Sequence, residues 1–263
     1  MQRSSAPFLE AYKVVQSGIL GKVRHVEVIN PGGSARLERT TAEPSAAPPP
    51  GLDWEMFQGP APRRPYSSSR QHDWRSYWEY GGGPLADWGV LLLDIAHWYL
   101  GVTEPSRTAA AVHGWFNRPQ DDRVPDTIEV VWQYPNFVAN YSSRSGFLGT
   151  YLWGDEGVLF VNRHGYSVRP VGGNGRSAGG KPAFEEKTVA LYDEPPNGQA
   201  SFDSDCGRHT LNFLACIKSR QRPVCDIEVG AASTIPTSMG GASIRSGGKT
   251  IAWNGWERGI AGR

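Results

Sequence analysis

The sequence has little cysteine, no excess of either charge and no long apolar run, and each absence excludes a class of protein. It has three cysteines, Cys206, Cys216 and Cys225, and this small, odd number argues against a disulfide framework or a multi-cysteine zinc site. Its formal net charge is +1, whereas proteins that bind nucleic acids or anionic membranes usually carry a basic excess. We therefore expect neither a nucleic-acid partner nor a membrane partner.

Long apolar stretches are absent as well. No stretch approaches the roughly 18 consecutive apolar residues that a membrane-spanning helix needs. The N-terminal segment carries Arg3, Glu10 and Lys13, so it lacks the uninterrupted apolar core of a secretory signal peptide. The six histidines show no metal-ligand spacing, and no metal is expected. These features predict a cytoplasmic protein, although the loss of an N-terminal signal would leave the same pattern.

Glycine, proline and tryptophan are abundant, with 32, 20 and 10 copies in 263 residues. Hydrophobic residues make up 39% and charged residues 20%, which is ordinary for a folded chain of one or two domains. The glycines and prolines predict long loops, the longest over residues 31–70. The tryptophans predict either a large core or a surface that stacks on flat-faced ligands such as sugars.

Helices are expected at both ends of the chain and strands in the middle. The spacing of Phe8, Ala11, Tyr12 and Val15 predicts a helix over residues 7–17. Further helices are expected over residues 86–100, 208–218 and 227–245. Alternating or β-branched segments predict strands over residues 21–30, 107–116, 127–134, 138–143, 157–161 and 250–253. This order predicts an α+β fold, with an open, mostly antiparallel sheet and helices on one face.

Two glycine-rich segments imitate nucleotide-binding motifs but lack the required context. Residues 173–178 match the letters of the dinucleotide fingerprint, yet Pro182 and more glycines follow where a helix should begin. Residues 247–250 imitate the end of a phosphate-binding loop, but Ser243 occupies the position of its first glycine. We expect a loop at the first segment and a turn at the second.

The most informative segment runs from His72 to Gly101. Three glycines precede a helix that is predicted to carry Asp87, Leu91 and Asp94 on one face. Two carboxylates among aromatic rings suit a polyol, because carboxylates accept hydrogen bonds from hydroxyls and rings stack on sugar faces. The alternative is that Asp87 only complements the helix dipole and Asp94 is a solvated or capped group. The flanking rings belong to Trp74, Trp78, Tyr80 and Trp88.

At this segment the sequence resembles the Gfo/Idh/MocA oxidoreductase family, the glucose-fructose oxidoreductase and inositol dehydrogenase group. Residues 78–101 read WEYGGGPLADWGVLLLDIAHWYLG, where typical members read WEYGGGPLTDWGVHLLDIAxWxLG. Four further stretches agree: Gln2-Arg3 with the helix up to Gly21-Lys22-Val23, LDWEMFQGPAPRRPY, GDEGVLFVNRHG and RHTLNFLACIKSRQRPVCDIEVG. The resemblance covers nearly the whole chain. It implies a Rossmann domain that binds NAD or NADP, followed by an open antiparallel sheet with substrate and oligomer contacts.

The chain departs from the family pattern at its start. Residues 1–21 resemble the end of a Rossmann domain, and residues 22–263 resemble the substrate and oligomerisation domain. The glycine-rich phosphate turn and the family's E-K-P segment with its catalytic lysine are absent, so the Rossmann domain is expected to be largely missing. We therefore expect this chain to bind no cofactor by itself, whereas full-length members use NAD or NADP.

The resemblance also implies roles for individual residues. Family members place a histidine four residues after the aspartate that matches Asp87, and this histidine transfers the proton. Here the position is Leu91, which cannot transfer a proton, so Asp87 is the remaining catalytic candidate. Asp94 matches a second helix carboxylate that contacts substrate hydroxyls. Further substrate-binding candidates lie in the preceding loop: His72, Arg75, Trp78 and Tyr80.

Three functions are compatible with these observations. The first is the sugar- or cyclitol-binding half of an NAD(P)-dependent oxidoreductase, inactive alone. The second is a non-enzymatic binding or oligomerisation module, which forms a homo-oligomer through its open sheet or associates with full-length relatives. The third is a cofactor-independent enzyme that uses Asp87 and Asp94 as an acid/base pair. Whether the chain is an enzyme stays open at this point, and the sequence does not name the sugar.

Overall fold

The computed structural model describes most of the chain as a sheet with helices packed on one face. The described residues are 1–31, 47–103, 105, 107–115, 122–171, 184–190 and 199–253. The strands are β1 (Val23–Ile29), β2 (Arg107–Gly114), β3 (Thr127–Gln133), β4 (Val138–Ser142), β5 (Gly149–Gly154), β6 (Gly157–Val161), β7 (Gly165–Pro170), β8 (Lys187–Ala190) and β9 (Ile251–Ala252). The helical segments are η1 (Gln2–Ser4), α1 (Ala6–Gln16), α3 (Trp54–Gln58), α4 (Ser68–His72), η2 (Trp74–Ser76), η3 (Leu85–Gly89), α5 (Val90–Leu100), α6 (Gln199–Ser219) and α7 (Ile227–Arg245).

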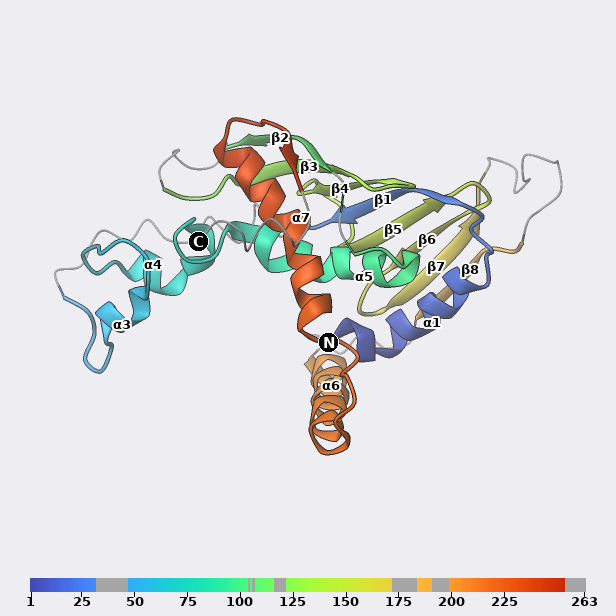
Figure 1. The fold of residues 1–263 in the computed structure, drawn as a ribbon, viewed down its shortest axis with the longest axis horizontal. Helices are drawn as coiled ribbons and strands as arrows, with labels where there is room; N and C mark the ends of the chain where they lie inside the picture. Colours follow the sequence, from blue (N-terminus) through green and yellow to red (C-terminus); the bar gives the residue numbers. More distant parts are fainter. Residues whose placement is uncertain are drawn as a thin grey trace.

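These strands form one open sheet in the order β8-β7-β6-β5-β1-β4-β3-β2-β9. β1 pairs in parallel with β4, and the other neighbouring strands of the described part pair antiparallel. α1, α5 and α7 lie on one face of this sheet (Figure 1). The predicted α+β fold, an open and mostly antiparallel sheet with helices on one face, is therefore confirmed.

The hydrophobic core lies between the sheet and these three helices. Strand residues alternate between core and outer face, so that Val26 and Val28 of β1 are fully buried. Phe8 and Ala11 of α1 fill the same core, which confirms the predicted helix over residues 7–17. Gly18, with φ of 79°, follows the end of this helix. The proposed domain boundary between residues 21 and 22 stays a prediction.

Three strands, β5, β7 and β8, were not predicted from the sequence. β5 is bounded by Gly149 and Gly154, and glycine weakens the sequence signal of a strand. Both glycines are required by close packing. A Cβ on Gly149 would meet the Phe160 ring at 2.5 Å, and one on Gly154 would overlap the carbonyl oxygen of Leu20.

Part of the predicted loop over residues 31–70 folds into a small aromatic lobe, which we define as residues 52–80. It contains α3, α4 and η2, whereas residues 32–46 of the predicted loop lie outside the described part. The Trp54 ring stacks on Phe57, with centroids 5.0 Å apart, and meets Tyr66 edge-on at 5.3 Å. The Trp54 indole also donates a hydrogen bond to the Arg64 carbonyl at 2.8 Å. The lobe therefore has its own small apolar centre.

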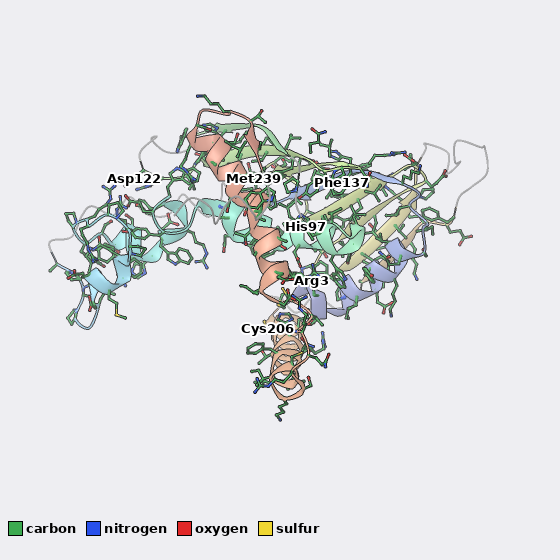
Figure 2. All side chains as sticks on the ribbon, in the orientation of Figure 1. Arg3, His97, Asp122, Phe137, Cys206 and Met239 are labelled. Atoms are coloured by element: carbon green, nitrogen blue, oxygen red, sulfur yellow. The ribbon has the colours of Figure 1, made fainter. Side chains whose placement is uncertain are left out.

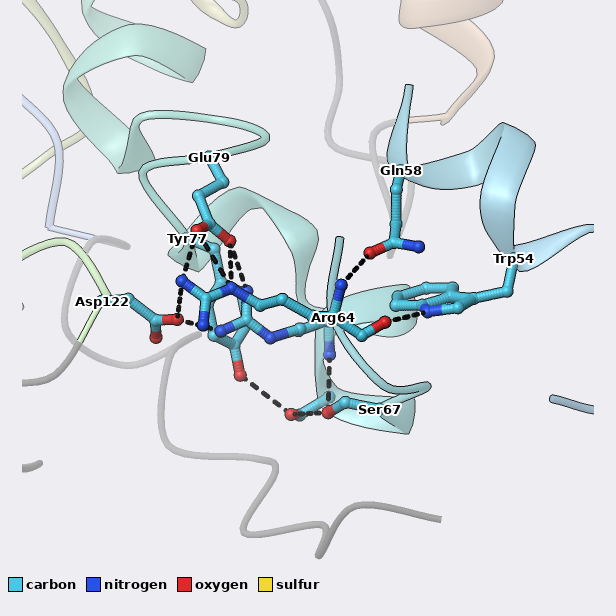
Figure 3. Close-up of polar contacts among 9 residues, drawn as sticks. Trp54, Gln58, Arg64, Ser67, Tyr77, Glu79 and Asp122 are labelled. Atoms are coloured by element: carbon cyan, nitrogen blue, oxygen red, sulfur yellow. Dashed lines mark hydrogen bonds and ion pairs between the residues drawn. The ribbon is translucent and has the colours of Figure 1, made fainter. Parts of the chain in front are cut away.

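Two arginines and two carboxylates form an ion-pair network at the edge of the lobe (Figure 3). Arg64 and Arg70 donate to the two oxygens of Glu79 at 2.5 and 2.7 Å, and Arg70 also contacts Asp122, which precedes β3. The Arg70 guanidinium lies 4.4 Å from the centre of the Tyr77 ring. These contacts join the aromatic lobe to the segment before β3. They also fix the position of η2, which is separated from α4 by one residue.

The closing helices α6 and α7 form where helices were expected, although α6 begins nine residues before the predicted position 208. The Asp226 side chain caps α7 by accepting from the Val229 amide at 2.9 Å. Gly247 and Gly248 have positive φ, which confirms the predicted turn over residues 247–250. The other glycine-rich segment, residues 173–178, lies outside the described part. Among described residues, the helices are too short or too polar to cross a membrane.

Candidate functional site

The triple-glycine turn brings Arg75 to Asp87. A Cβ on Gly81 would lie 2.7 Å from the Arg75 Cα and 3.1 Å from the Trp74 ring. Gly83 has φ of 76°, and a Cβ there would meet the Val124 side chain at 2.5 Å. Glycine is required at both positions, because the chain folds tightly beneath η2 before it enters η3. The turn therefore positions the first helical turn directly beside Arg75.

Asp87 and Arg75 form a half-exposed ion pair. The Arg75 Nε donates to the Asp87 Oδ2 at 3.1 Å, and their side chains are 52% and 32% exposed. The Arg75 guanidinium also lies 4.2 Å from the centre of the Trp74 ring. The next residue after Asp87, Trp88, faces the guanidinium of Arg163 at 4.9 Å. An accessible carboxylate thus lies beside an arginine that covers the Trp74 ring, and the next residue of the chain carries a second ring that is covered by an arginine.

The first turn of the predicted helix differs from an ordinary α-helix. Residues 85–89 form a π-type turn, η3, before α5 begins at Val90, so the predicted helix over 86–100 is confirmed with a changed start. Hydrogen bonds in such a turn reach five residues ahead, so residues four apart no longer lie directly above one another. Leu91 is half-buried and lies outside the hydrophobic core cluster. It is therefore only partly covered, four residues after Asp87 in the chain.

Asp94 lies in a different environment from Asp87. The Nε and Nη2 of Arg3 donate to its two oxygens at 2.9 and 2.8 Å, and the Ser233 hydroxyl donates to the same carboxylate at 2.7 Å. Its side chain is 15% exposed. In Figure 2 Arg3 lies at the upper end of α6, close to Cys206. Asp94 therefore joins η1, α5 and α7, and its oxygens already accept three hydrogen bonds.

The remaining predicted substrate contacts lie apart from Asp87 and Arg75. Trp78 is half-buried, and the Arg245 guanidinium of α7 lies 4.9 Å from the centre of its ring. Tyr80 packs inside the aromatic lobe, 5.9 Å from the Phe57 centroid, and its buried hydroxyl has no hydrogen-bond partner among the described residues. His72 is exposed at the end of α4. Of the five substrate-binding candidates, the structure therefore brings only Arg75 to Asp87.

His97 belongs to the core. Its Nε2 lies 2.7 Å from the Tyr134 hydroxyl, and the residue is 4% exposed. Burial lowers the pKa of His97 to about 4, so the ring is neutral at physiological pH. This histidine supports α5 from inside and is not positioned to replace the proton-transfer histidine whose place Leu91 takes.

The sequence did not indicate that Arg163 contacts Trp88, or that Arg3 pairs with Asp94. Arg163 follows β6 and reaches Trp88, 75 positions earlier in the chain, which no local pattern could indicate. The available signal was the run GDEGVLFVNRHG, which contains Arg163 and resembles the family. Arg3 lies in the N-terminal segment, which resembles the end of a Rossmann domain and for which no site role was predicted.

The arrangement around Asp87 suits binding of a hydroxylated ligand. A carboxylate accepts hydrogen bonds from hydroxyls, Arg75 donates them, and the indoles of Trp74 and Trp88 offer flat apolar faces. Within the described ranges no group of three or more His, Cys, Asp or Glu side chains could hold a metal ion. The Gly81–Gly83 turn does not form a dinucleotide cradle, because Trp74, Arg75 and Val124 fill the space beside it.

A family model described as the oxidoreductase family, C-terminal alpha/beta domain, of the Gfo/Idh/MocA group, matches residues 5–136, about half of the chain. No curated protein sequence matches the chain. Solved structures share its fold at low sequence identity. An aldose-aldose oxidoreductase from Caulobacter crescentus, complexed with glycerol, is 18% identical with a TM-score of 0.57. That match covers 96% of this chain and 62% of the other.

Two further structures are similar. An oxidoreductase from Agrobacterium radiobacter, in complex with NAD+, L-tartaric acid and magnesium, is 13% identical, with a TM-score of 0.56 and coverage of 95% and 62%. An oxidoreductase from Thermotoga maritima is 16% identical, with a TM-score of 0.51 and coverage of 95% and 60%. The chain thus spans less than two thirds of the length of these structures, and the matched family model describes a C-terminal domain.

Proposed function

Because the chain belongs to the Gfo/Idh/MocA oxidoreductase family, we propose that it is the sugar- or cyclitol-binding half of an NAD(P)-dependent hydride-transfer enzyme. The observation that carries this proposal is the half-exposed Asp87–Arg75 pair beside Trp74 and Trp88. This pair offers one acceptor, one donor and two flat rings, which is the chemistry that a polyol needs. The structure of a related protein holds glycerol, a small polyol, which agrees with this ligand class.

In this proposal, each residue of the site has a limited task. Asp87 accepts a hydrogen bond from a substrate hydroxyl, and Arg75 holds the carboxylate in place and donates to a second hydroxyl. Trp74 and Trp88 exclude water from one face of the ring. Leu91 occupies the position from which a histidine would take the hydroxyl proton, so this chain leaves that role unfilled.

The hydride acceptor would have to be bound outside the described residues. A nicotinamide cofactor needs a strand, a glycine-rich turn and a helix N-terminus around its pyrophosphate, and the described residues do not form this unit. We therefore assign no step through the cofactor to this chain. It contributes binding and orientation of the sugar, and it is expected to be inactive without a nucleotide-binding domain.

The test joins a nucleotide-binding domain from a member of the family in front of Gln2 and measures oxidation of a panel of aldoses and cyclitols. The fusion that retains Leu91 is expected to be poorly active. Leu91→His should raise the rate by roughly 100-fold, the usual size of a general acid/base contribution. Leu91→Gln is the matched control, because it adds a polar side chain of similar length that does not take up a proton at neutral pH.

The outcomes separate a site from a structural surface. Equal rates for the unsubstituted, Leu91→His and Leu91→Gln fusions, with a lower melting temperature for both variants, would show that this helix face is structural. The cofactor-independent alternative draws no support from the geometry, since Arg3 and Ser233 hold the carboxylate of Asp94. Sugar turnover by the unfused chain without any nicotinamide would contradict both statements.

The sheet face opposite the helices supports a second proposal, a homo-oligomer formed through that face. Tyr151, Trp153 and Phe160 lie there as a partly exposed cluster, with the Tyr151 and Phe160 centroids 4.5 Å apart. None of the helices described packs on this side (Figure 1). An aromatic surface of this kind usually marks an interface. We expect a dimer or larger assembly in light scattering at micromolar concentration, and a Trp153→Asp variant that is monomeric.

A further inference from the structure

The two halves of the candidate site belong to different parts of the molecule. Trp74 and Arg75 lie in η2 of the aromatic lobe, whereas Asp87 and Trp88 lie in η3, directly before α5. The helices α3 and α4 of the lobe lie at the opposite end of the molecule from α1 in the view of Figure 1. The geometry of the Asp87–Arg75 pair therefore depends on how the lobe is held against the rest of the chain.

Four charged side chains form a closed ring at the edge of the lobe, which we call the charge ring: Arg64, Arg70, Glu79 and Asp122. Each arginine lies within ion-pair distance of both carboxylates (Figure 3). Arg64 lies 2.5 Å from Glu79 and 3.6 Å from Asp122. The Arg70 side chain is 11% exposed and lies 2.7 Å from Glu79. A charge this buried requires its partners, because an unpaired buried charge is strongly unfavourable.

The charge ring closes around η2. Arg70 lies in α4 and Glu79 follows η2, so the ion pair between them joins residues nine positions apart, with Trp74 and Arg75 between them. The Arg70 guanidinium also covers the Tyr77 ring, 4.4 Å from its centre. The two ends of the segment that carries Trp74 and Arg75 are therefore tied together.

Asp122 joins the charge ring to the segment before β3. Its backbone carbonyl accepts from the Trp78 amide at 3.3 Å, and the Val124 amide donates to the Ser76 carbonyl at 2.8 Å. Its carboxylate is the member of the charge ring that lies outside the lobe. A substitution that removes only this negative charge would therefore weaken the charge ring and leave the groups of both backbone hydrogen bonds in place.

We propose that the charge ring positions Arg75 for ligand binding, with Asp122 as a positioning residue that acts through η2. This inference rests on the proposed function, in which Arg75 holds the Asp87 carboxylate and donates to a ligand hydroxyl. A hydrogen bond weakens steeply when its distance or angle is lost, so a loosened η2 would make Arg75 a poorer donor without removing it. In this arrangement Asp122 does not touch the ligand.

The first experiment measures amide hydrogen exchange over residues 74–80 of the 263-residue chain. Asp122→Asn keeps the shape of the side chain and removes its charge, and we expect exchange in this segment to become at least tenfold faster. Exchange in α1 should stay the same, because α1 packs on β6 and β7. Glu55→Gln is the matched control, since it removes an exposed ion pair with Arg63 in the same lobe, and it should change neither segment.

The second experiment measures affinity for D-glucose and for myo-inositol by calorimetric titration. We expect Asp122→Asn to weaken binding of the tighter of the two about tenfold. Combined with Arg75→Gln, the same substitution should cause no further loss, because two residues that act through one contact are not additive. Asp122→Glu retains the negative charge and should bind within about threefold of the unchanged chain.

The outcomes separate this inference from the proposed function. Faster exchange over residues 74–80, with neither compound bound by the unchanged chain, would support the positioning of η2 and contradict the proposed function. Unchanged exchange in Asp122→Asn, or unchanged affinity, would overturn the inference alone. Equal losses of affinity with and without Arg75→Gln would overturn it as well, because Asp122 would then not act through Arg75. Faster exchange in α1 too would identify the charge ring as a general stabilising element and have the same result.

Discussion

The two carboxylates of one helical segment, Asp87 and Asp94, lie seven residues apart and have opposite environments. Among the described residues Asp87 pairs with Arg75, and both side chains are accessible to solvent. Asp94 is largely buried and accepts from Arg3 and Ser233. The sequence places both on one predicted helix face. The structure shows that the number of partners, and not the spacing, decides which carboxylate is free to meet a ligand.

The largest expected effect comes from removing the buried carboxylate. Asp94→Ala leaves the Arg3 guanidinium largely buried without its partner, and breaking such a pair typically costs about 3 kcal/mol or more. We expect the free energy of unfolding in urea to fall by that amount. Asp87→Ala is the matched control and should change it by less than about 0.5 kcal/mol, as for an exposed ion pair. Similar losses at both positions would contradict the distinction.

A second expected effect concerns pH and the same buried end of α5. The pKa of His97 is lowered from 6.5 to about 4, so the unfolded chain takes up a proton before the folded one does. The stabilisation from a neutral His97 is therefore fully present above pH 6.5 and is lost as pH falls toward 4. The loss amounts to about 3 kcal/mol, from about 1.4 kcal/mol per pKa unit. It should appear in urea unfolding curves measured from about pH 7 to about pH 4.

The control for this pH effect is His97→Gln, which keeps a polar partner for Tyr134 but does not titrate in this range. Its free energy of unfolding should decrease less steeply below pH 6.5 than that of the unchanged chain. Parallel pH curves for the two proteins would show that His97 does not carry the dependence.

The smallest expected effect is on ligand affinity at the open end of the helix. Asp87→Asn removes the charge that would accept a sugar hydroxyl, and we expect affinity for the best-binding member of an aldose and cyclitol panel to fall about tenfold. Asp155→Asn, in an exposed pair with Arg24, should leave the affinity unchanged. Calorimetric titration measures both. An equal affinity in all three proteins would remove Asp87 from the proposed site.

Local sequence patterns predicted an element correctly where the apolar spacing within that one segment determines its structure. The apolar spacing of α1 predicted that helix over residues 7–17, and the alternation in β1 predicted that strand. The patterns failed where distant residues decide. The glycines at the ends of β5 are explained only by Phe160 and Leu20. The strand signal in that segment was weak for the same reason.

The candidate site was predictable in part. The run around Asp87 identified the helix, the glycine turn and the nearby tryptophans. It did not reveal that Arg3 and Ser233 donate hydrogen bonds to the Asp94 carboxylate, because those residues lie 91 positions earlier and 139 positions later in the chain. It also gave no sign of the wide turn η3, which separates the two carboxylates in orientation.

The central position of β1 has a consequence for how this chain folds. β1 lies between β5 and β4, so its partners are synthesised more than a hundred residues after it. The early strand must wait unpaired on the ribosome until residues 138–154 emerge, and such long-range pairing slows folding. Without β1 the sheet would divide into two separate groups of strands, β8-β7-β6-β5 and β4-β3-β2-β9. The strand that is made before all its partners is therefore the one that completes the sheet.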